Sequence, residues 1–289
     1  MTIVVTGATG HLGRLTVDSL LARGVAASDI RAVGRSAERL APLAAQGVET
    51  AVIDFEKPET LTAAFAGADA LLLVSGSEVG KRVQQHRNAI EAAEAAGVGR
   101  IVYTSAPRAT DTDLILAPEH KATEELLAAS SLPVTVLRNN WYTENYTGLL
   151  DQAAATGEIV GSAGAGRVAS ASRKDYAEAA AVALITPGHD GAVYELSGDM
   201  AWSFDELAEV VGTLVGREVA YRSVTPEEHT GILTGAGLAE GTAGFVVALD
   251  GNIRDGALGD ATTTLSELIG RPTTPLAQGL AESREEAAA

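Results

Sequence analysis

Three glycines near the start of the chain have the spacing of a phosphate-binding loop. Gly7, Gly10 and Gly13 follow directly on the apolar residues Ile3–Val5 and precede an amphipathic helical pattern over Leu12–Ala22. Such glycines permit a tight turn and a close approach of backbone to a pyrophosphate, and the amino end of the next helix supplies N–H groups and partial positive charge. We therefore expect a dinucleotide here, contacted by Gly7, Thr9, Gly10, His11, Leu12 and Gly13.

The end of the second expected strand indicates which dinucleotide is bound. Enzymes that use NAD place Asp or Glu there, where the carboxylate accepts hydrogen bonds from the ribose 2′-hydroxyl. In this chain that position holds Arg35 and the acid is missing. Because a guanidinium pairs well with a phosphate, Arg35 is expected to bind the 2′-phosphate of NADP. The sequence therefore favours NADPH over NADH.

Polar residues also follow the other expected strands. The carboxyl ends of parallel strands meet at one edge of a sheet, and a dinucleotide lies along that edge. The expected further contacts are Asp54 and Phe55 beside the adenine, Ser75, Gly76 and Ser77 near the ribose and nicotinamide, and Thr104, Ser105 and Asn139 along the same edge.

The usual proton donor of short-chain carbonyl reductases is missing. Those enzymes use a serine with Tyr-x-x-x-Lys, but here His120 takes the tyrosine position, Glu124 takes the lysine position, and the pattern occurs nowhere in the chain. A ketone needs a proton donor during reduction, whereas a quinone or a cationic dye needs much less acid help. The sequence thus favours an activated acceptor, although His120, Tyr142 or Tyr146 could still donate a proton. We interpret the i, i+4 pair of His120 and Glu124 as an ion pair on the helix surface rather than a metal site.

Short apolar segments alternate with helical patterns through the first half of the chain. This alternation implies right-handed crossovers and a parallel sheet, and so an α/β fold of the Rossmann type with a doubly wound sheet. The six expected strands are Ile3–Val5, Ile30–Val33, Glu49–Ile53, Ala70–Val74, Arg100–Thr104 and Val134–Leu137.

The second half of the chain has a different pattern, which indicates a smaller C-terminal α+β lobe that binds the substrate. Glycine-rich stretches over Gly157–Gly166 and Gly231–Gly244 are expected to separate its elements. A Ser203–Glu206 capping box predicts a helix start. We expect an NADP-binding domain over residues 1–145 and a mainly substrate-binding lobe over 146–289, with some segments returning to the sheet. The expected elements are helices over Arg173–Ile185, Ser203–Val215 and Thr263–Ile269, and strands over Val193–Leu196 and Glu218–Arg222.

The composition excludes several classes of function. The 289 residues include 21 Lys and Arg against 38 Asp and Glu, a formal net charge of −17, so we expect no binding to nucleic acid or to anionic membranes. The absence of cysteine excludes disulfides, thiolate nucleophiles and Cys-ligated metal centres. No signal-peptide pattern is visible and no apolar run approaches the roughly 20 residues of a membrane span. We expect a cytoplasmic protein without a bound metal.

The chain resembles the NmrA-like atypical short-chain dehydrogenase/reductases, in particular their bacterial NAD(P)H:quinone oxidoreductase branch, with triphenylmethane reductase nearby. Members of this family characteristically lack Tyr-x-x-x-Lys, as this chain does. The segments that carry the resemblance are Gly7–Gly13, Arg35, Leu71–Arg87, Ile101–Ser105, Ala117–Glu125, Leu137–Tyr146, Ala169–Tyr176, Val193–Trp202 and Leu268–Pro275.

The resemblance implies a two-lobed enzyme, a monomer or a homodimer, that takes NADPH and passes a hydride to a planar acceptor such as a quinone. It also implies that nicotinamide and acceptor lie beside Asn140, Trp141 and Tyr142. Two alternatives stay open: an imine, azo or triphenylmethane-dye reductase with the same site, and a non-catalytic redox sensor that binds NADP and signals to a partner.

Overall fold

The computed structural model describes residues 1–288, and the chain divides into two compact units. The first unit holds Met1–Thr110, Leu116–Asn139 and Arg173–Leu196. The second holds Asp111–Ile115, Asn140–Ser172 and the described chain from Ser197 onward. The division thus falls after Asn139, a few residues before the boundary expected near residue 145, and the stretch Arg173–Leu196 belongs with the first unit.

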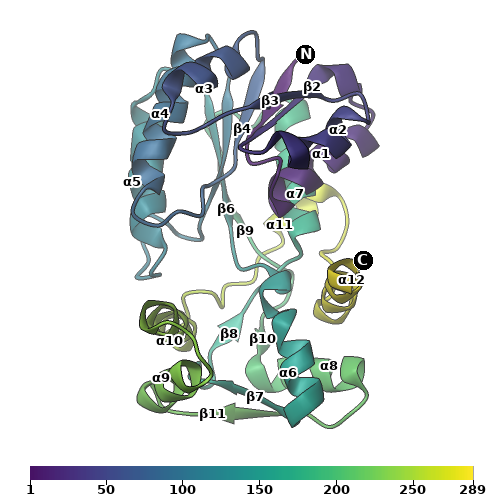
Figure 1. Ribbon diagram of the computed structural model, residues 1–289, viewed down its shortest axis with the longest axis vertical. Helices are drawn as coiled ribbons and strands as arrows, with labels where there is room; N and C mark the ends of the chain where they lie inside the picture. The colour runs from purple at the N-terminus through teal and green to yellow at the C-terminus, as the bar shows by residue number, and fades with distance from the viewer. Residues whose placement is uncertain (289) are drawn as a thin grey trace. The chain divides into compact units, whose positions relative to one another are not determined.

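A seven-stranded parallel sheet forms the centre of the first unit (Figure 1). The strand order is β3-β2-β1-β4-β5-β6-β9, so the direction of winding reverses between β1 and β4. This reversal defines the Rossmann-type doubly wound sheet and confirms the predicted fold class. The strands are β1 (Ile3–Val5), β2 (Ile30–Gly34), β3 (Glu49–Val52), β4 (Ala70–Leu73), β5 (Ile101–Ser105), β6 (Val134–Asn139) and β9 (Val193–Leu196).

The six strands predicted in the first half are all present, with small differences at their ends. In β1, Val4 pairs with Arg31 of β2 on one side and Leu71 of β4 on the other. The central strands are fully buried because helices cover both faces of the sheet, which explains their continuous apolar runs. The predicted strand over Val193–Leu196 returns to this sheet as β9, beside β6.

Helices lie on both faces of this sheet (Figure 1). One side carries α3, α4 and α5, whose apolar side chains share a core with Val4, Leu71 and Tyr103. The other side carries α1 and α7, which pack against each other. The helices of this unit are α1 (His11–Ala22), α2 (Ala37–Ala44), α3 (Pro58–Phe65), α4 (Arg82–Ala95), α5 (Ala117–Ala129) and α7 (Arg173–Ile185), with a 3-10 turn η1 (Ala27–Asp29).

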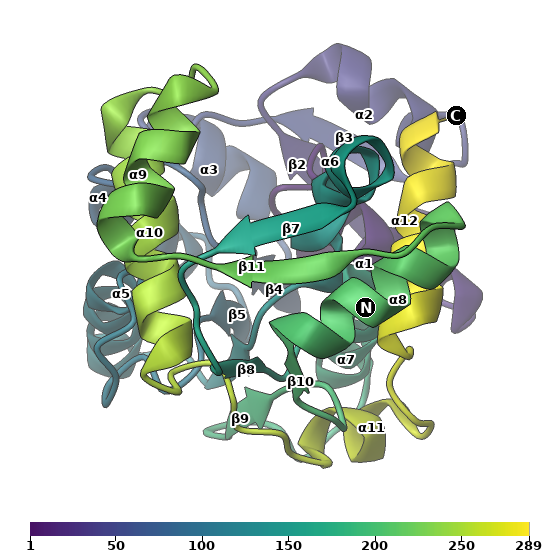
Figure 2. The ribbon, with the colours of Figure 1, turned by 90° about the horizontal axis from the view of Figure 1, so that it is seen from below.

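The second unit combines short strand pairs with helices. In Figure 2, β7 (Glu158–Gly161) and β11 (Ala220–Ser223) lie side by side as a parallel pair. The other pair is antiparallel, between β8 (Arg167–Val168) and β10 (Trp202–Ser203). The helices are α6 (Gly148–Thr156), α8 (Phe204–Val215), α9 (Pro226–Gly235), α10 (Glu240–Arg254), α11 (Thr264–Ile269) and α12 (Leu276–Ala288), with a 3-10 turn η2 (Thr143–Tyr146).

Two helices of this unit lie where the sequence suggested a separating stretch. Helix α8 starts as predicted, because Ser203 and Glu206 form the reciprocal capping box. The glycine-rich stretch Gly231–Gly244, however, contains the end of α9 and the start of α10. A second capping box, between Thr225 and Glu228, starts α9, and this local signal outweighs the helix-weakening effect of the glycines. None of the helices within residues 1–288 is both long and apolar enough to cross a membrane.

Candidate dinucleotide-binding site

The glycine loop between β1 and α1 forms a tight turn. Gly7 has a φ of +62°, and its carbonyl accepts a hydrogen bond of 2.8 Å from Gly10 N–H. A Cβ on Gly13 would lie 2.4 Å from the Gly7 carbonyl oxygen, so a larger residue would push α1 away from the loop. In the described chain no side chain caps the first turn of α1. The loop therefore leaves the amino end of the helix, with its partial positive charge, available to a phosphate.

A pocket of about 800 Å³ opens from this loop along the carboxyl edge of the sheet. Its volume lies within the range of about 300–1,000 Å³ that is typical of small-molecule sites. The pocket brings together the predicted residues of the loop and of the ends of β2, β3 and β4: Gly7, Thr9, Gly10, His11, Leu12, Gly13, Arg35, Asp54, Phe55, Ser75, Gly76 and Ser77.

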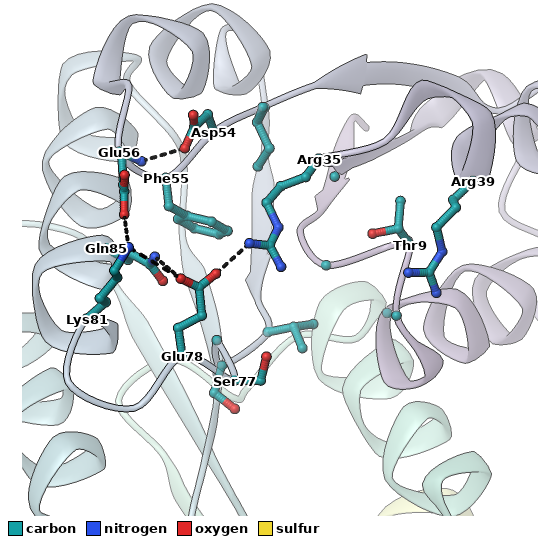
Figure 3. Close-up of a pocket in the computed structure, with 18 of the residues that line it drawn as sticks. Thr9, Arg35, Arg39, Asp54, Phe55, Glu56, Ser77, Glu78, Lys81 and Gln85 are labelled. Atoms are coloured by element: carbon teal, nitrogen blue, oxygen red, sulfur yellow. Dashed lines mark hydrogen bonds and ion pairs between the residues drawn. The ribbon is translucent and has the colours of Figure 1, made fainter.

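Charged residues that the sequence analysis did not single out also line this pocket. Arg39 lies in the first turns of α2 and points toward Thr9 in Figure 3. Its spacing from Arg35, one helical turn along the chain, is the signal that could have found it. The pocket also holds Glu56, Glu78 and Lys81, in a chain whose net charge is −17. The pocket lining thus carries four basic side chains against three acidic ones, whereas the whole chain has an excess of acidic residues.

Phe55 and Asp54 follow β3 at the opposite wall of the pocket (Figure 3). The Phe55 ring offers an apolar surface on which a planar base can stack. The Asp54 carboxylate accepts a 2.9 Å hydrogen bond from Glu56 N–H, which lowers the pKa of Asp54. Asp54 therefore stabilises the turn that presents Phe55.

Buried side chains position the loop between β4 and α4. Thr104 accepts a hydrogen bond of 2.9 Å from Ser75 N–H, so this predicted contact residue holds the pocket wall and does not line it. His86 Nε2 accepts a bond of 3.0 Å from Gly76 N–H, and Arg82 donates to the Gly76 carbonyl at 2.6 Å. Because Nε2 accepts, the proton of neutral His86 lies on Nδ1, which contacts the Thr123 hydroxyl at 2.9 Å. Burial lowers the pKa of His86 to about 3.

The residues at the catalytic positions of carbonyl reductases lie outside the lining of this pocket. Ser105 donates a 2.6 Å hydrogen bond to Glu124, and Arg138 donates to both oxygens of that carboxylate. His120 Nδ1 lies 2.8 Å from the hydroxyl of Tyr103. Burial lowers the pKa of His120 to about 3, so the ring is neutral at physiological pH.

The interpretation of His120 and Glu124 as a helix-surface ion pair is therefore wrong. His120 is only 6% exposed and Glu124 only 9%. Their shared face of α5 packs on the sheet, and each side chain bonds to a strand residue rather than to the other. Among residues 1–288, no group of three or more Asp, Glu or His side chains is placed to hold a metal ion.

Asn139 ends β6 and is buried, and it too lies outside the pocket lining. The segment after it, Asn140–Tyr142, belongs to the second unit. Asn140 accepts a 2.7 Å hydrogen bond from Trp141 N–H and donates to the Leu258 carbonyl at 3.3 Å. Tyr142 forms an isolated parallel bridge with Ala171. These bonds fix the backbone of the segment.

Comparison with known proteins places the chain in a family. A sequence model of an NAD(P)H-binding family matches residues 7–187, which span the glycine loop and most of the first unit. The chain belongs to this NAD(P)H-binding family. It is similar to quinone oxidoreductase 2 of Escherichia coli, with 44% identity over 278 residues that cover 96% of this chain and 97% of that protein. The fit of the glycine loop, the pocket and Arg35 to a dinucleotide agrees with this assignment.

Solved structures and a further relative give the same picture. The structure of NADPH-dependent quinone oxidoreductase from E. coli with NADPH has a TM-score of 0.93 and 43% identity, covering 100% of both chains. Triphenylmethane reductase of Citrobacter sp. with NADP(H) has a TM-score of 0.93 and 38% identity, covering 98% of this chain and 100% of that one. An NmrA-like family domain-containing oxidoreductase of Aspergillus flavus is 31% identical, covering 79% of this chain and 76% of that protein. These findings confirm the predicted resemblance to the NmrA-like short-chain dehydrogenase/reductases.

Proposed function

We propose that the protein is an NADPH-dependent oxidoreductase that transfers a hydride to a quinone or a similar activated acceptor. One observation carries the proposal: a glycine-loop pocket with two arginines coexists with catalytic positions that are occupied by buried, hydrogen-bonded side chains. The likeness to quinone oxidoreductase 2 supports it.

In this proposal the residues of the first unit bind and orient the dinucleotide. The backbone N–H groups at the start of α1 face its pyrophosphate, and Gly13 allows the close packing that aims them. Arg35 and Arg39 bind the 2′-phosphate with charge-assisted hydrogen bonds, and Phe55 packs on the adenine. His86 and Arg82 hold the β4–α4 loop in place beneath it. Bound NADPH supplies the hydride.

The second unit is proposed to orient the acceptor through Asn140, Trp141 and Tyr142. Backbone and side-chain hydrogen bonds hold the backbone of this segment in place, and this fixes the positions from which the Trp141 and Tyr142 side chains extend. No strong acid is needed when the acceptor delocalises the incoming charge, as a quinone does. A quinone reductase therefore does not need the Tyr-x-x-x-Lys pair, which is absent from this chain.

Steady-state assays with the purified protein test the proposal. NADPH oxidation is followed with a benzoquinone-type acceptor and, as the matched control, with a simple ketone of similar size. We expect turnover of the quinone and none of the ketone above the buffer rate. Binding of the dinucleotide without turnover of any quinone or dye in the panel, together with a preference for the oxidised form, would favour the redox-sensor alternative. Reduction of the ketone would contradict the argument about the missing acid.

Reduction of a triphenylmethane dye is the second candidate activity. The likeness to the Citrobacter reductase favours it. A cationic dye is neutralised by the hydride and needs no proton, whereas a quinone becomes a hydroquinone anion that takes a proton from water, so neither acceptor needs a strong acid in the site. The same assay decides between the two, because the acceptor with the larger kcat/KM identifies the activity for which the site is better suited.

A further inference from the structure

Glu78 lies inside the dinucleotide pocket and faces Arg35 (Figure 3). One of its carboxylate oxygens pairs with Arg35 Nη1. The other lies 3.4 Å from Gln85 Nε2 and 3.9 Å from Lys81 Nζ. The guanidinium that would bind the 2′-phosphate is thus in direct contact with a carboxylate of the same pocket.

The backbone of Glu78 is held in place. Its carbonyl accepts hydrogen bonds from Lys81 N–H at 3.1 Å and Arg82 N–H at 3.0 Å, at the start of α4. The next part of the loop is fixed by Glu119, which accepts from Gly80 N–H at 2.7 Å and pairs with Arg82 at 2.7 Å. Arg35, in contrast, has an exposed side chain. The backbone that carries the Glu78 carboxylate is therefore fixed within reach of Arg35, whose own side chain is the more exposed of the two.

A carboxylate in this place affects NADPH and NADH in opposite ways. The 2′-phosphate of NADPH carries between one and two negative charges, so it is repelled by Glu78 and competes with it for Arg35. The ribose 2′-hydroxyl of NADH is neutral and can donate a hydrogen bond to a carboxylate, as it does to the acid at the end of β2 in enzymes that use NAD. In this chain the acid is supplied instead by the loop after β4.

We propose that Glu78 is a specificity-determining residue that limits the preference for NADPH created by Arg35. The inference rests on the proposed use of NADPH, with its 2′-phosphate bound by Arg35. It assigns to Glu78 a role in discrimination between the two dinucleotides and none in hydride transfer.

Direct titration of NADPH and NADH to Glu78→Gln tests the inference without any need for turnover. Removal of one like charge should increase the ratio of the NADH Kd to the NADPH Kd by about tenfold, which corresponds to roughly 1.4 kcal/mol. Glu38→Gln is the matched control, since it removes the same charge three residues after Arg35 from an exposed side chain outside the pocket lining. Its ratio should stay near the wild-type value. Glu78→Asp keeps the charge on a shorter side chain and should give an intermediate ratio. This graded response would not be expected if the glutamine variant altered the ratio only because it was misfolded.

The same titration in an Arg35→Gln background separates competition at Arg35 from a general effect of charge. Without the guanidinium, Glu78→Gln should give a smaller gain in NADPH affinity. An unchanged ratio in Glu78→Gln, or an equal change in Glu38→Gln, overturns the inference while NADPH binding by the wild-type protein stands. If the wild-type protein binds neither dinucleotide, the proposed function itself fails.

Discussion

The buried hydroxyl of Ser105, at the end of β5, donates a hydrogen bond of 2.6 Å to Glu124 of α5, the helix that follows this strand. Arg138 binds the same carboxylate through two nitrogens, at 3.0 and 2.6 Å. A carbonyl reductase presents a serine, a tyrosine and a lysine to its substrate at these positions. In this chain the serine and the residue at the lysine position, Glu124, bond to each other and to Arg138 instead. The network connects α5 to the sheet, and its three residues lie outside the lining of the dinucleotide pocket.

Glu124→Gln should destabilise the fold. The change leaves the Arg138 guanidinium with Glu195 as its remaining charged partner, 2.8 Å away, and breaks a pair that is almost fully buried. Loss of one partner of such a pair costs about 3 kcal/mol in the free energy of unfolding. Urea unfolding measures the difference. Glu125→Gln, at the exposed neighbouring position, is the control and should change this free energy by less than about 0.5 kcal/mol. Equal stability of both variants would contradict a structural role for the pair.

Stability should fall as the pH is lowered, because two histidines are buried in the neutral form. Burial lowers the pKa of His86 and of His120 to about 3 in the folded protein, against an ordinary histidine pKa of 6.5. Between these values the unfolded chain binds more protons than the folded one, so acid favours unfolding. Each histidine contributes up to about 1.4 kcal/mol per pH unit in this window and nothing to the slope above it.

Urea unfolding between pH 7.5 and 4.5 checks this prediction, because the two histidines together should give the free energy of unfolding a slope of up to about 2.8 kcal/mol per pH unit below pH 6.5. His120→Gln should reduce the slope, since the amide stays neutral throughout. His11→Gln, which removes an exposed histidine, should keep the wild-type slope. A wild-type slope that is unchanged by His120→Gln would mean that the acid sensitivity arises elsewhere.

The part of the site that the sequence predicted is the part encoded by short segments. The turn at Gly7, the packing at Gly13 and the cation at Arg35 each follow from residues close together in the chain and next to a strand end. The same holds for α8, where the Ser203–Glu206 capping box alone fixes the first turn. Such local structure can be predicted from the sequence because it depends on residues that are close together in the chain.

Apart from Arg39, which its spacing from Arg35 could have indicated, the site residues that the sequence does not reveal depend on contacts between distant segments. The periodicity of α5 places His120 and Glu124 on one face but does not say whether that face meets solvent or the sheet. Similarly, the sequence places Ser77 at the same edge of the sheet as Arg35, but it does not indicate that the side chain of the next residue, Glu78, pairs with that guanidinium, 43 residues earlier. The pocket brings the two together only once β1, β2 and β4 are adjacent.

The two arginines of the pocket should make unequal contributions to binding of the phosphorylated dinucleotide. Arg35→Gln removes the guanidinium at the end of β2 and should weaken NADPH binding by roughly 10- to 100-fold, the equivalent of about 1.5–3 kcal/mol for a charged hydrogen bond. NADH binding should change little, since its ribose lacks the phosphate. Arg39→Gln should give a smaller loss, because Arg39 lies in α2, four residues beyond the strand-end position from which this fold contacts the 2′ group of the ribose. Titration of both dinucleotides provides the comparison. An equal loss of NADH affinity in Arg35→Gln would contradict the role of Arg35 in binding the 2′-phosphate.

Gly13→Ala should disable the dinucleotide site through the backbone. A Cβ at this position would lie 2.4 Å from the Gly7 oxygen and 2.9 Å from Ala8 N, and both contacts are with backbone atoms of the loop that cannot rotate away. The start of α1 must then shift from the loop, so we expect weaker binding of NADPH and NADH alike, together with a loss of stability of about 1–3 kcal/mol.

Gly231→Ala is the matched control, because Gly231 lies within helix α9 and its Cβ would meet nothing within 4 Å. Alanine is favoured over glycine in a helix by about 1 kcal/mol, so this variant should be as stable as the wild type or more so and should bind both dinucleotides normally. The two substitutions are chemically identical and are expected to act in opposite directions on the free energy of unfolding. If Gly13→Ala bound dinucleotides as well as Gly231→Ala, the close approach of α1 to the Gly7 turn would not be what forms the phosphate site.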